Sequence, residues 1–128
     1  MAGQLNLEID AGSYWSYTIT WKDSAGNPVD LTGYQAQMQA RPSVDSATVE
    51  FSLATPGNSL IPAPDGQITL GGVDGTLLLE LPASASSARG VRSRRSFSYD
   101  LEVVPPNGKT LRLLEGYVIL TPEVTREA

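Results

Sequence analysis

Alternation of apolar and polar residues is the feature of this sequence that most constrains its fold. In the stretch YWSYTITW, from Tyr14 to Trp21, every second residue is large and apolar, and the residues between are Ser or Thr. A repeat of two with aromatic and β-branched residues is typical of a strand that buries one face. We expect this stretch to be a long, central strand.

The same alternation recurs along the chain, between turns rich in Gly and Pro. Residues 83–89 form the one good helix candidate, because Pro82 precedes them and Gly90 can cap them. The apolar parity changes near Leu113–Leu114, which predicts a bulge. Residues 43–66 show only a short strand at 49–53. The other expected strands are 5–9, 14–21, 34–41, 67–70, 76–81, 97–103 and 111–120.

This succession of short strands without βαβ units predicts an all-β fold. We expect an antiparallel β-sandwich of seven to nine strands with one short helix. The 128 residues fit a single domain, residues 1–128.

Composition removes most familiar kinds of active site. The chain has no cysteine and no histidine, so it lacks thiolate ligands, disulfides and the usual general base near neutral pH. It also has no G-x-S-x-G elbow and no phosphate-binding glycine motif. We therefore expect no enzymatic activity and no cofactor.

Charge and hydropathy limit the partners. Fourteen acidic residues against nine basic ones give a net charge of −5, which disfavours binding to a phosphate backbone. No apolar stretch approaches the roughly 20 residues of a membrane span. The N-terminus has no basic start and no apolar core, so we expect neither a secretory signal nor a membrane anchor.

The one notable charge cluster is RGVRSRR, which holds Arg89, Arg92, Arg94 and Arg95. A solvated loop accounts for most short charge runs. Arginine also pairs carboxylates bidentately and is enriched at interfaces. We predict that these four residues dock the chain on an acidic partner, a second copy included. No aromatic residue interrupts the run, which argues against nucleic acid.

A second cluster of polar residues, Asp23, Asn27 and Asp30, surrounds Gly26 and Pro28. Oxygen ligands around a glycine can form a calcium loop. The EF-hand spacing fails here, because Gly26 comes too early and both flanks are strands. A looser metal site remains an alternative, but Asp, Asn, Gly and Pro are also the residues that a tight turn needs.

Three further groups invite a functional interpretation. Asp100 and Glu102 project from one face of a strand, as paired catalytic acids would, but such pairs are also ordinary on an exposed sheet. Exposed Tyr14 is a candidate for stacking on sugars. The serines at 84, 86 and 87 have no histidine to activate them, so we interpret them as loop and cap residues.

Taken in order, several segments resemble a family of small structural proteins of tailed bacteriophages. The resemblance rests on LEIDAGSYWSYTITWKDSAGNPVDLTGYQAQMQAR, QITLGGVDGTLLLELPAS, SYDLEVVPPNGKTLRLLEG and YVILTPEVTRE. The chain is also similar to the N-terminal domain of phage baseplate upper proteins. The resemblance implies an immunoglobulin-like sandwich with a role in assembly. Unlike those baseplate proteins, the sequence continues into no stalk, so we expect a free-standing module.

The expected function is therefore that of a non-enzymatic virion protein of the tail or the head–tail neck. A capsid cement or decoration protein is the close alternative, and a carbohydrate-binding adsorption module is the alternative of another class. Expected partners are other phage virion proteins, with several copies or a homo-oligomer in the particle. We expect synthesis in the host cytoplasm and no contact with nucleic acid or membrane.

Overall fold

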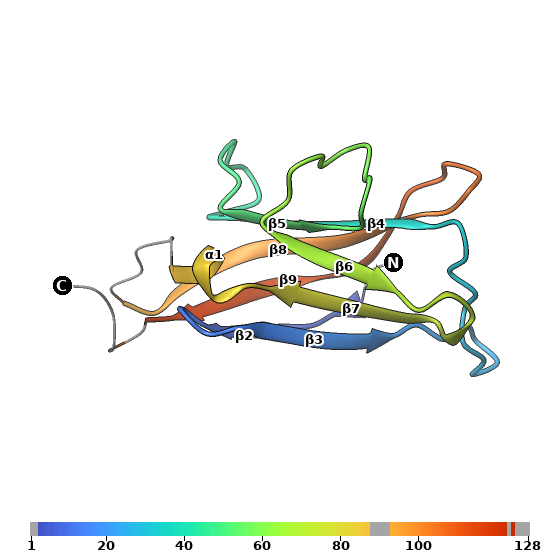
Figure 1. The fold of residues 1–128 in the computed structure, drawn as a ribbon, viewed down its shortest axis with the longest axis horizontal. Coiled ribbons are helices and arrows are strands. Elements are labelled where there is room, and N and C mark those ends of the chain that lie inside the picture. The colour runs from blue at the N-terminus through green and yellow to red at the C-terminus, as the bar shows by residue number, and fades with distance from the viewer. Residues whose placement is uncertain (1–2, 88–92, 123, 125–128) are drawn as a thin grey trace.

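The computed structural model describes residues 3–87, 93–122 and 124, and these residues are mostly in β-strands (Figure 1). The prediction of a mostly β chain with one short α-helix is confirmed over this part. In chain order the elements are β1 (Gly3–Gln4), β2 (Leu7–Asp10), β3 (Trp15–Thr20), β4 (Gln35–Arg41), β5 (Phe51–Ala54), β6 (Gly66–Leu70), the 3₁₀ helix η1 (Gly72–Asp74), β7 (Thr76–Leu81), α1 (Ala83–Ser87), β8 (Arg95–Val104) and β9 (Leu111–Thr121).

The described strands form one mixed sheet in the order β1-β9-β8-β4-β5-β6-β7-β3, and β2 also pairs with β9. The prediction of a purely antiparallel sandwich is wrong, because β1 and β2 run parallel to β9 and β5 runs parallel to β6. The loop 55–65 turns back along β5, so that β6 begins beside Leu53 and runs in the same direction as β5. Alternation within a strand gives no information about the direction of its neighbour.

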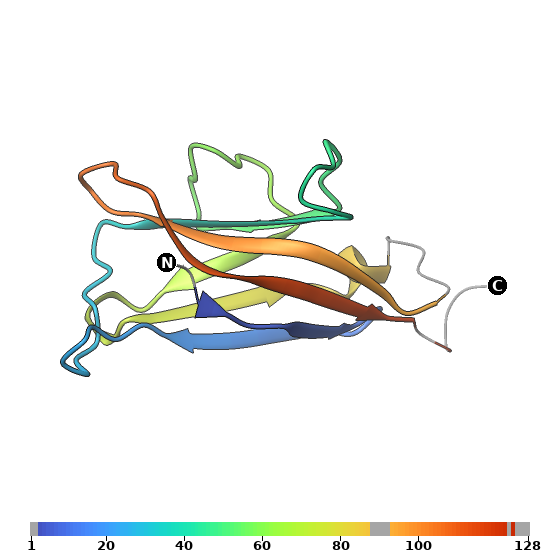
Figure 2. The same cartoon turned by 180° about the vertical axis from the view of Figure 1, so that it is seen from behind.

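The sheet curls over on itself. Residues 11–14 alone join β2 to β3, although these strands lie at opposite ends of the strand path. In Figure 1, β3, β7 and β6 lie in front of β2, β9 and β8, and Figure 2 shows the same arrangement from behind. The expectation that β3 is central is wrong, because among the described strands it pairs with β7 alone.

The apolar faces of the strands meet inside this curl. In β8 every second residue from Phe97 to Val103 is buried, as the alternation predicts. Phe97 packs edge-to-face on Phe51, with ring centroids 6.4 Å apart. The largest fully buried side chains are Phe51, Phe97, Ile9, Leu31, Met38, Leu53, Ile68, Leu77, Leu79, Leu81, Leu101 and Leu120.

The loop after β5 is held against β4 by Asn58, which is buried. Its Nδ2 donates to the carbonyl of Ala36 and to Oε1 of Gln37, both at 3.1 Å. Its Oδ1 accepts from the amides of Leu60 and Ile61. A polar residue therefore fixes the part of the chain whose course the alternation could not predict.

Candidate functional site

The predicted arginine cluster falls only partly within the described residues. Arg89 and Arg92 lie outside them. The Arg94 side chain is 63% exposed, and its Nη2 lies 3.5 Å from Oε1 of Glu8. Arg95 begins β8, and its guanidinium carbon lies 4.8 Å from the centroid of the Phe97 ring. Docking through these four residues stays a prediction.

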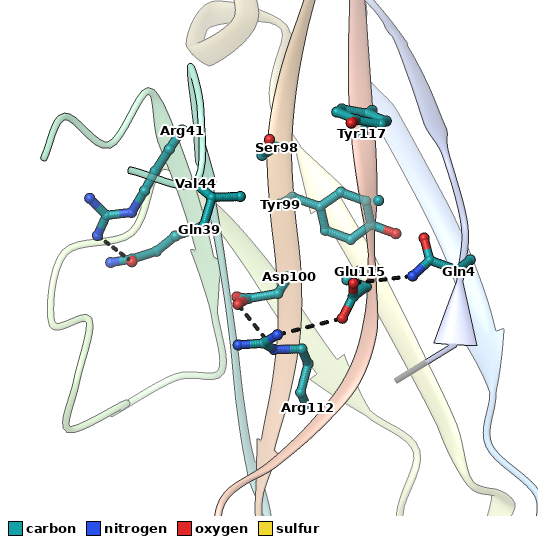
Figure 3. Close-up of a pocket in the computed structure, with 11 residues that line it drawn as sticks. Gln4, Gln39, Arg41, Val44, Ser98, Tyr99, Asp100, Arg112, Glu115 and Tyr117 are labelled. Atoms are coloured by element: carbon teal, nitrogen blue, oxygen red, sulfur yellow. Dashed lines mark hydrogen bonds and ion pairs between the residues drawn. The ribbon is translucent and has the colours of Figure 1, made fainter. Parts of the chain in front are cut away.

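A polar groove of about 280 Å³ crosses the outer face of β4, β8 and β9 (Figure 3). Its floor carries a chain of charged groups. Arg112 lies between two carboxylates, with Nε 3.4 Å from Oδ2 of Asp100 and Nη1 3.5 Å from Oε1 of Glu115. Gln4 Nε2, from β1, donates to the other Glu115 oxygen at 3.1 Å. The strands β1 and β4 and the hairpin of β8 and β9, which are distant from one another in sequence, thus contribute to this groove.

A bulge in β9 produces the arrangement. Leu101 of β8 pairs with Leu114, but Glu102 pairs with Arg112, so Leu113 has no partner in the register. The extra residue changes the parity of the strand. Arg112 therefore projects from the same face as Glu115. The bulge that the sequence predicted near Leu113–Leu114 is confirmed.

The electrostatics of the groove centre on Asp100. Burial raises the pKa of the Asp100 carboxyl above its ordinary value of 3.8, and the nearby charges of Glu102 and Glu115 add to this effect. Arg112 and Arg41 oppose it by favouring the ionised form. Burial outweighs the two arginines, so the pKa of the Asp100 carboxyl stays above its ordinary value.

Arg41 is the second cation of the groove, and β4 holds it in place. Its Nη2 donates to Oε1 of Gln39 at 3.0 Å, and its Nη1 donates to the carbonyl of Ser46 at 2.8 Å. Its guanidinium is thus oriented by groups of its own hairpin, and Figure 3 shows it on the opposite side of β8 from Glu115.

Two large apolar side chains stand at the groove. Val44 is 83% exposed and Tyr117 is 55% exposed, and both line the cavity. Neither was predicted from the sequence as a functional residue. An exposed tyrosine and arginines in one groove are the composition that protein interfaces favour. The only available signal was the alternation in β9, which assigns Tyr117 to the outer face.

The carboxylate pair Asp100 and Glu102 lies on one face of β8, as predicted, and both side chains are half-buried. Glu102 Oε1 accepts a hydrogen bond from Nε2 of Gln37 at 3.0 Å, whereas Asp100 pairs with Arg112. Each acid is thus bound to a different neighbour, and the two lie side by side on one strand. This is unlike a catalytic pair that flanks a substrate from two sides.

The candidate metal ligands act as turn residues. Asp23 Oδ1 accepts from the amides of Ala25 and Asn27, both at 3.0 Å. Asp30 Oδ1 accepts from the amide and the hydroxyl of Thr32, and these hydrogen bonds lower the pKa of Asp30. Within residues 3–87, 93–122 and 124 no cluster of three or more acidic side chains could hold a metal ion.

Tyr14 lies at a second groove of about 490 Å³, which the loop 55–65, the start of β6 and β7 form. Its ring is 62% exposed, and its hydroxyl donates to Oε2 of Glu80. This hydrogen bond raises the pKa of Tyr14. Three prolines and Ile61 contribute apolar surface to the same groove; the prolines are Pro56, Pro62 and Pro64.

Of the serines in α1, Ser86 has a structural role. It is buried, its Oγ accepts from the amide of Gly12 at 2.9 Å, and its hydroxyl donates to the carbonyl of Ala83. It therefore ties α1 to the connection between β2 and β3.

Comparison with known proteins adds no relative, because no family model and no curated protein sequence matches this chain. Neither described helix has the length and apolar character to cross a bilayer.

Proposed function

We propose that this chain is a non-enzymatic structural protein of a tailed-phage virion, which attaches to the tail or the head–tail neck. The sequence resemblance described above supports this class. The mostly β fold suits a small rigid domain that is used in several copies, whose weak contacts add through multivalency.

We also propose that the fold is immunoglobulin-like. The strands β3, β7 and β6 would form one layer, and β5, β4, β8, β9 and β2 the other. Only two residue pairs, Leu53↔Gly66 and Ala54↔Gln67, join β5 to β6. Such a short join is consistent with a boundary between two layers.

One observation supports the docking role: the exposed side chains of Tyr117 and Val44 line the same groove as the ion-pair network of Asp100, Arg112 and Glu115. Tyrosine and arginine anchor many protein interfaces. Ion pairs already join the side chains of Asp100, Arg112 and Glu115. These side chains are therefore ordered before a partner binds, and binding costs little side-chain entropy there. The groove is thus our proposed docking face, with the arginine cluster Arg89, Arg92, Arg94 and Arg95 as a second contact.

Incorporation into particles tests this proposal. The double variant Val44→Ser, Tyr117→Ser should fold normally and be lost from purified phage particles. A matched control replaces Leu60 and Val73 by Ser. These residues are also well exposed, at 62% and 68%, but do not line the groove, so this variant should be incorporated as the parent is. Normal incorporation of the groove variant would contradict the docking face. Absence of the parent chain from particles would contradict the virion assignment.

Copy number separates the two virion locations. About a dozen or fewer copies per particle would support the tail or neck, whereas hundreds would support the capsid cement alternative, in which lattice avidity dominates. Quantitative mass spectrometry of purified particles gives this number. Replacing the four arginines by Ser tests the second contact in the same assay, and unchanged incorporation would exclude it.

A carbohydrate-binding role is the second candidate, and the Tyr14 groove favours it. An exposed ring beside the carboxylate of Glu80 offers a stacking surface and a hydrogen-bond acceptor for a sugar. A glycan array with the purified chain tests this role. Binding that is lost in Tyr14→Ala would support it, and no binding by the parent would exclude it.

A further inference from the structure

Among the described strands β3 pairs with β7 alone, and its other edge is a second surface, separate from the proposed docking groove. Trp21, directly after β3, donates its amide to the carbonyl of Gly75 at 2.8 Å, so its backbone points toward the β7 side. Backbone groups alternate between the two neighbours of an antiparallel strand. The amides and carbonyls of Ser16, Thr18 and Thr20 therefore point away from β7, toward the edge.

The residues of β3 themselves provide none of the usual protection against pairing. Edge strands are commonly blocked by a charge, a proline or a bulge. The segment Trp15–Thr20, WSYTIT, contains no charged residue, no proline and no glycine, and its six residues pair with β7 in unbroken register. Ser16, Thr18 and Thr20 are all exposed. By contrast β2, at the other end of the sheet, carries Glu8 and Asp10.

We propose that two copies of the chain pair through β3, antiparallel about a two-fold axis at Thr18. In this register Ser16 lies opposite Thr20 of the second copy, Tyr17 lies opposite Ile19, and Thr18 lies opposite itself. The outward backbone groups then form about six hydrogen bonds. Cross-strand hydroxyl pairs and an aromatic–β-branched pair are favourable contacts in a sheet.

The half-exposed Tyr17 supports this register. Its ring stacks on Trp15, with centroids 6.5 Å apart and planes 6° from parallel, and 40% of the residue remains exposed. Ile19 of the second copy would cover part of that surface. The ring is already held by its neighbour, so little side-chain freedom is lost on pairing.

Charge complementarity favours a second copy as the occupant. The register places Lys22 of one copy opposite Tyr14 of the other, and the Tyr14 hydroxyl is bound to Glu80. Glu80 lies beside Ser16 in the β3–β7 pairing, one strand from the interface. Two strand spacings of about 4.8 Å each separate Lys22 from Glu80, a distance that the lysine and glutamate side chains span together. Two-fold symmetry forms this contact twice, which offsets part of the repulsion between two chains that each carry a net charge of −5.

Sedimentation velocity on the purified chain tests the proposal, with a dimer as the expected result. Thr18→Lys places two like charges opposite each other and should give a monomer with an unchanged circular dichroism spectrum. Thr69→Lys is the matched control, because Thr69 is an exposed threonine of the interior strand β6. It adds the same charge and should remain dimeric.

A crosslink tests the register independently. The chain has no native cysteine, so Thr18→Cys treated with a short bifunctional maleimide should give a covalent dimer, whereas Thr69→Cys should not. A monomeric parent, or a dimer that persists in Thr18→Lys, would overturn the proposal. The groove variant Val44→Ser, Tyr117→Ser should still dimerise, so failure of this proposal and failure of the docking face are distinguishable.

Discussion

Arg112 and Glu115 lie three residues apart on β9, yet their side chains meet on one face of the sheet, with Nη1 3.5 Å from Oε1. An odd separation in a regular strand would place them on opposite faces. The unpaired residue Leu113 removes this conflict. The groove therefore depends on a single extra residue in the strand.

Deleting Leu113 should be tolerated. The deletion converts the bulge into regular pairing and leaves Arg112 opposite Glu102 on the outer face. The expected cost is about 1–2 kcal/mol, from the lost partial burial of a leucine. Deleting Tyr117, where the pairing is regular, should instead turn one half of β9 inside out and prevent folding. Urea unfolding of both variants measures the difference, and equal effects would contradict the assignment of the bulge.

The Asp100 carboxyl should make stability fall as the pH rises. Its folded-state pKa is above the ordinary 3.8, chiefly because of burial, so unfolding releases a proton in the interval between the two values. The loss of stability that comes from ionising this carboxyl in the folded chain is absent below pH 3.8 and complete above the folded-state pKa. As the pH rises from 3 to 7, the free energy of unfolding of Asp100→Asn should therefore increase relative to that of the parent. The increase should be about 1 kcal/mol or less at this partly exposed site. Urea unfolding at both pH values gives the comparison.

Tyr99 should produce a second pH dependence, at the alkaline end. Its hydroxyl donates to the carbonyl of Leu5 at 2.6 Å, and burial raises its pKa from 10.0 to about 12. The unfolded chain ionises first, so stability should fall from pH 10 upward. Tyr99→Phe should lose about 1 kcal/mol at neutral pH through the missing hydrogen bond. It should also show a smaller decline above pH 10 than the parent, and an equal decline would contradict this role.

The strands and the bulge were predictable because alternation is a local property. Residues that bury one face repeat every second position, and a change of parity such as that at Leu113–Leu114 marks an extra residue. The helix at 83–87 was predictable for the same reason, since Pro82 marks its start. These signals each lie within a few residues of the element that they predict.

The groove was not predictable, because its parts come together only through long-range pairing. Gln4 and Glu115 are 111 residues apart in the sequence, and they meet because β1 pairs with β9. No motif joins these residues in the sequence. The arginine cluster is recognisable in the sequence by its local density, whereas Arg112 and Arg41 are isolated cations in the sequence and gain their neighbours only in the fold.

Calcium should not stabilise the chain, because Asp23 is already used by its turn. The same Oδ1 accepts hydrogen bonds from two amides. Asp23→Ala should cost about 1 kcal/mol through their loss, whereas Asp45→Ala, an exposed control with the same charge change, should cost little. Added calcium should leave the melting temperature of the parent unchanged. A calcium-dependent increase that disappears in Asp23→Ala would contradict the turn interpretation.

Gly116, the glycine of β9, should be hard to replace, because the N-terminal segment passes directly over it. A Cβ at this position would lie 2.3 Å from the carbonyl oxygen of Leu5, which is backbone and cannot move aside freely. That carbonyl is the acceptor for Tyr99, and the next amide, of Tyr117, donates to Asn6 Oδ1. Gly116→Ala should therefore push β1 off the sheet and cost about 2–4 kcal/mol.

The matched control is Gly108→Ala, where φ is +78° but no atom lies within 4 Å of the added Cβ. It should cost only the strain of the left-handed backbone, about 1 kcal/mol. Hydrogen exchange distinguishes the two variants further. The amide of Leu5, which donates to the carbonyl of Glu115, should lose protection in Gly116→Ala and keep it in Gly108→Ala. Because Gln4 of the displaced β1 also binds Glu115, Gly116→Ala should weaken particle incorporation as well, if the groove is the docking face.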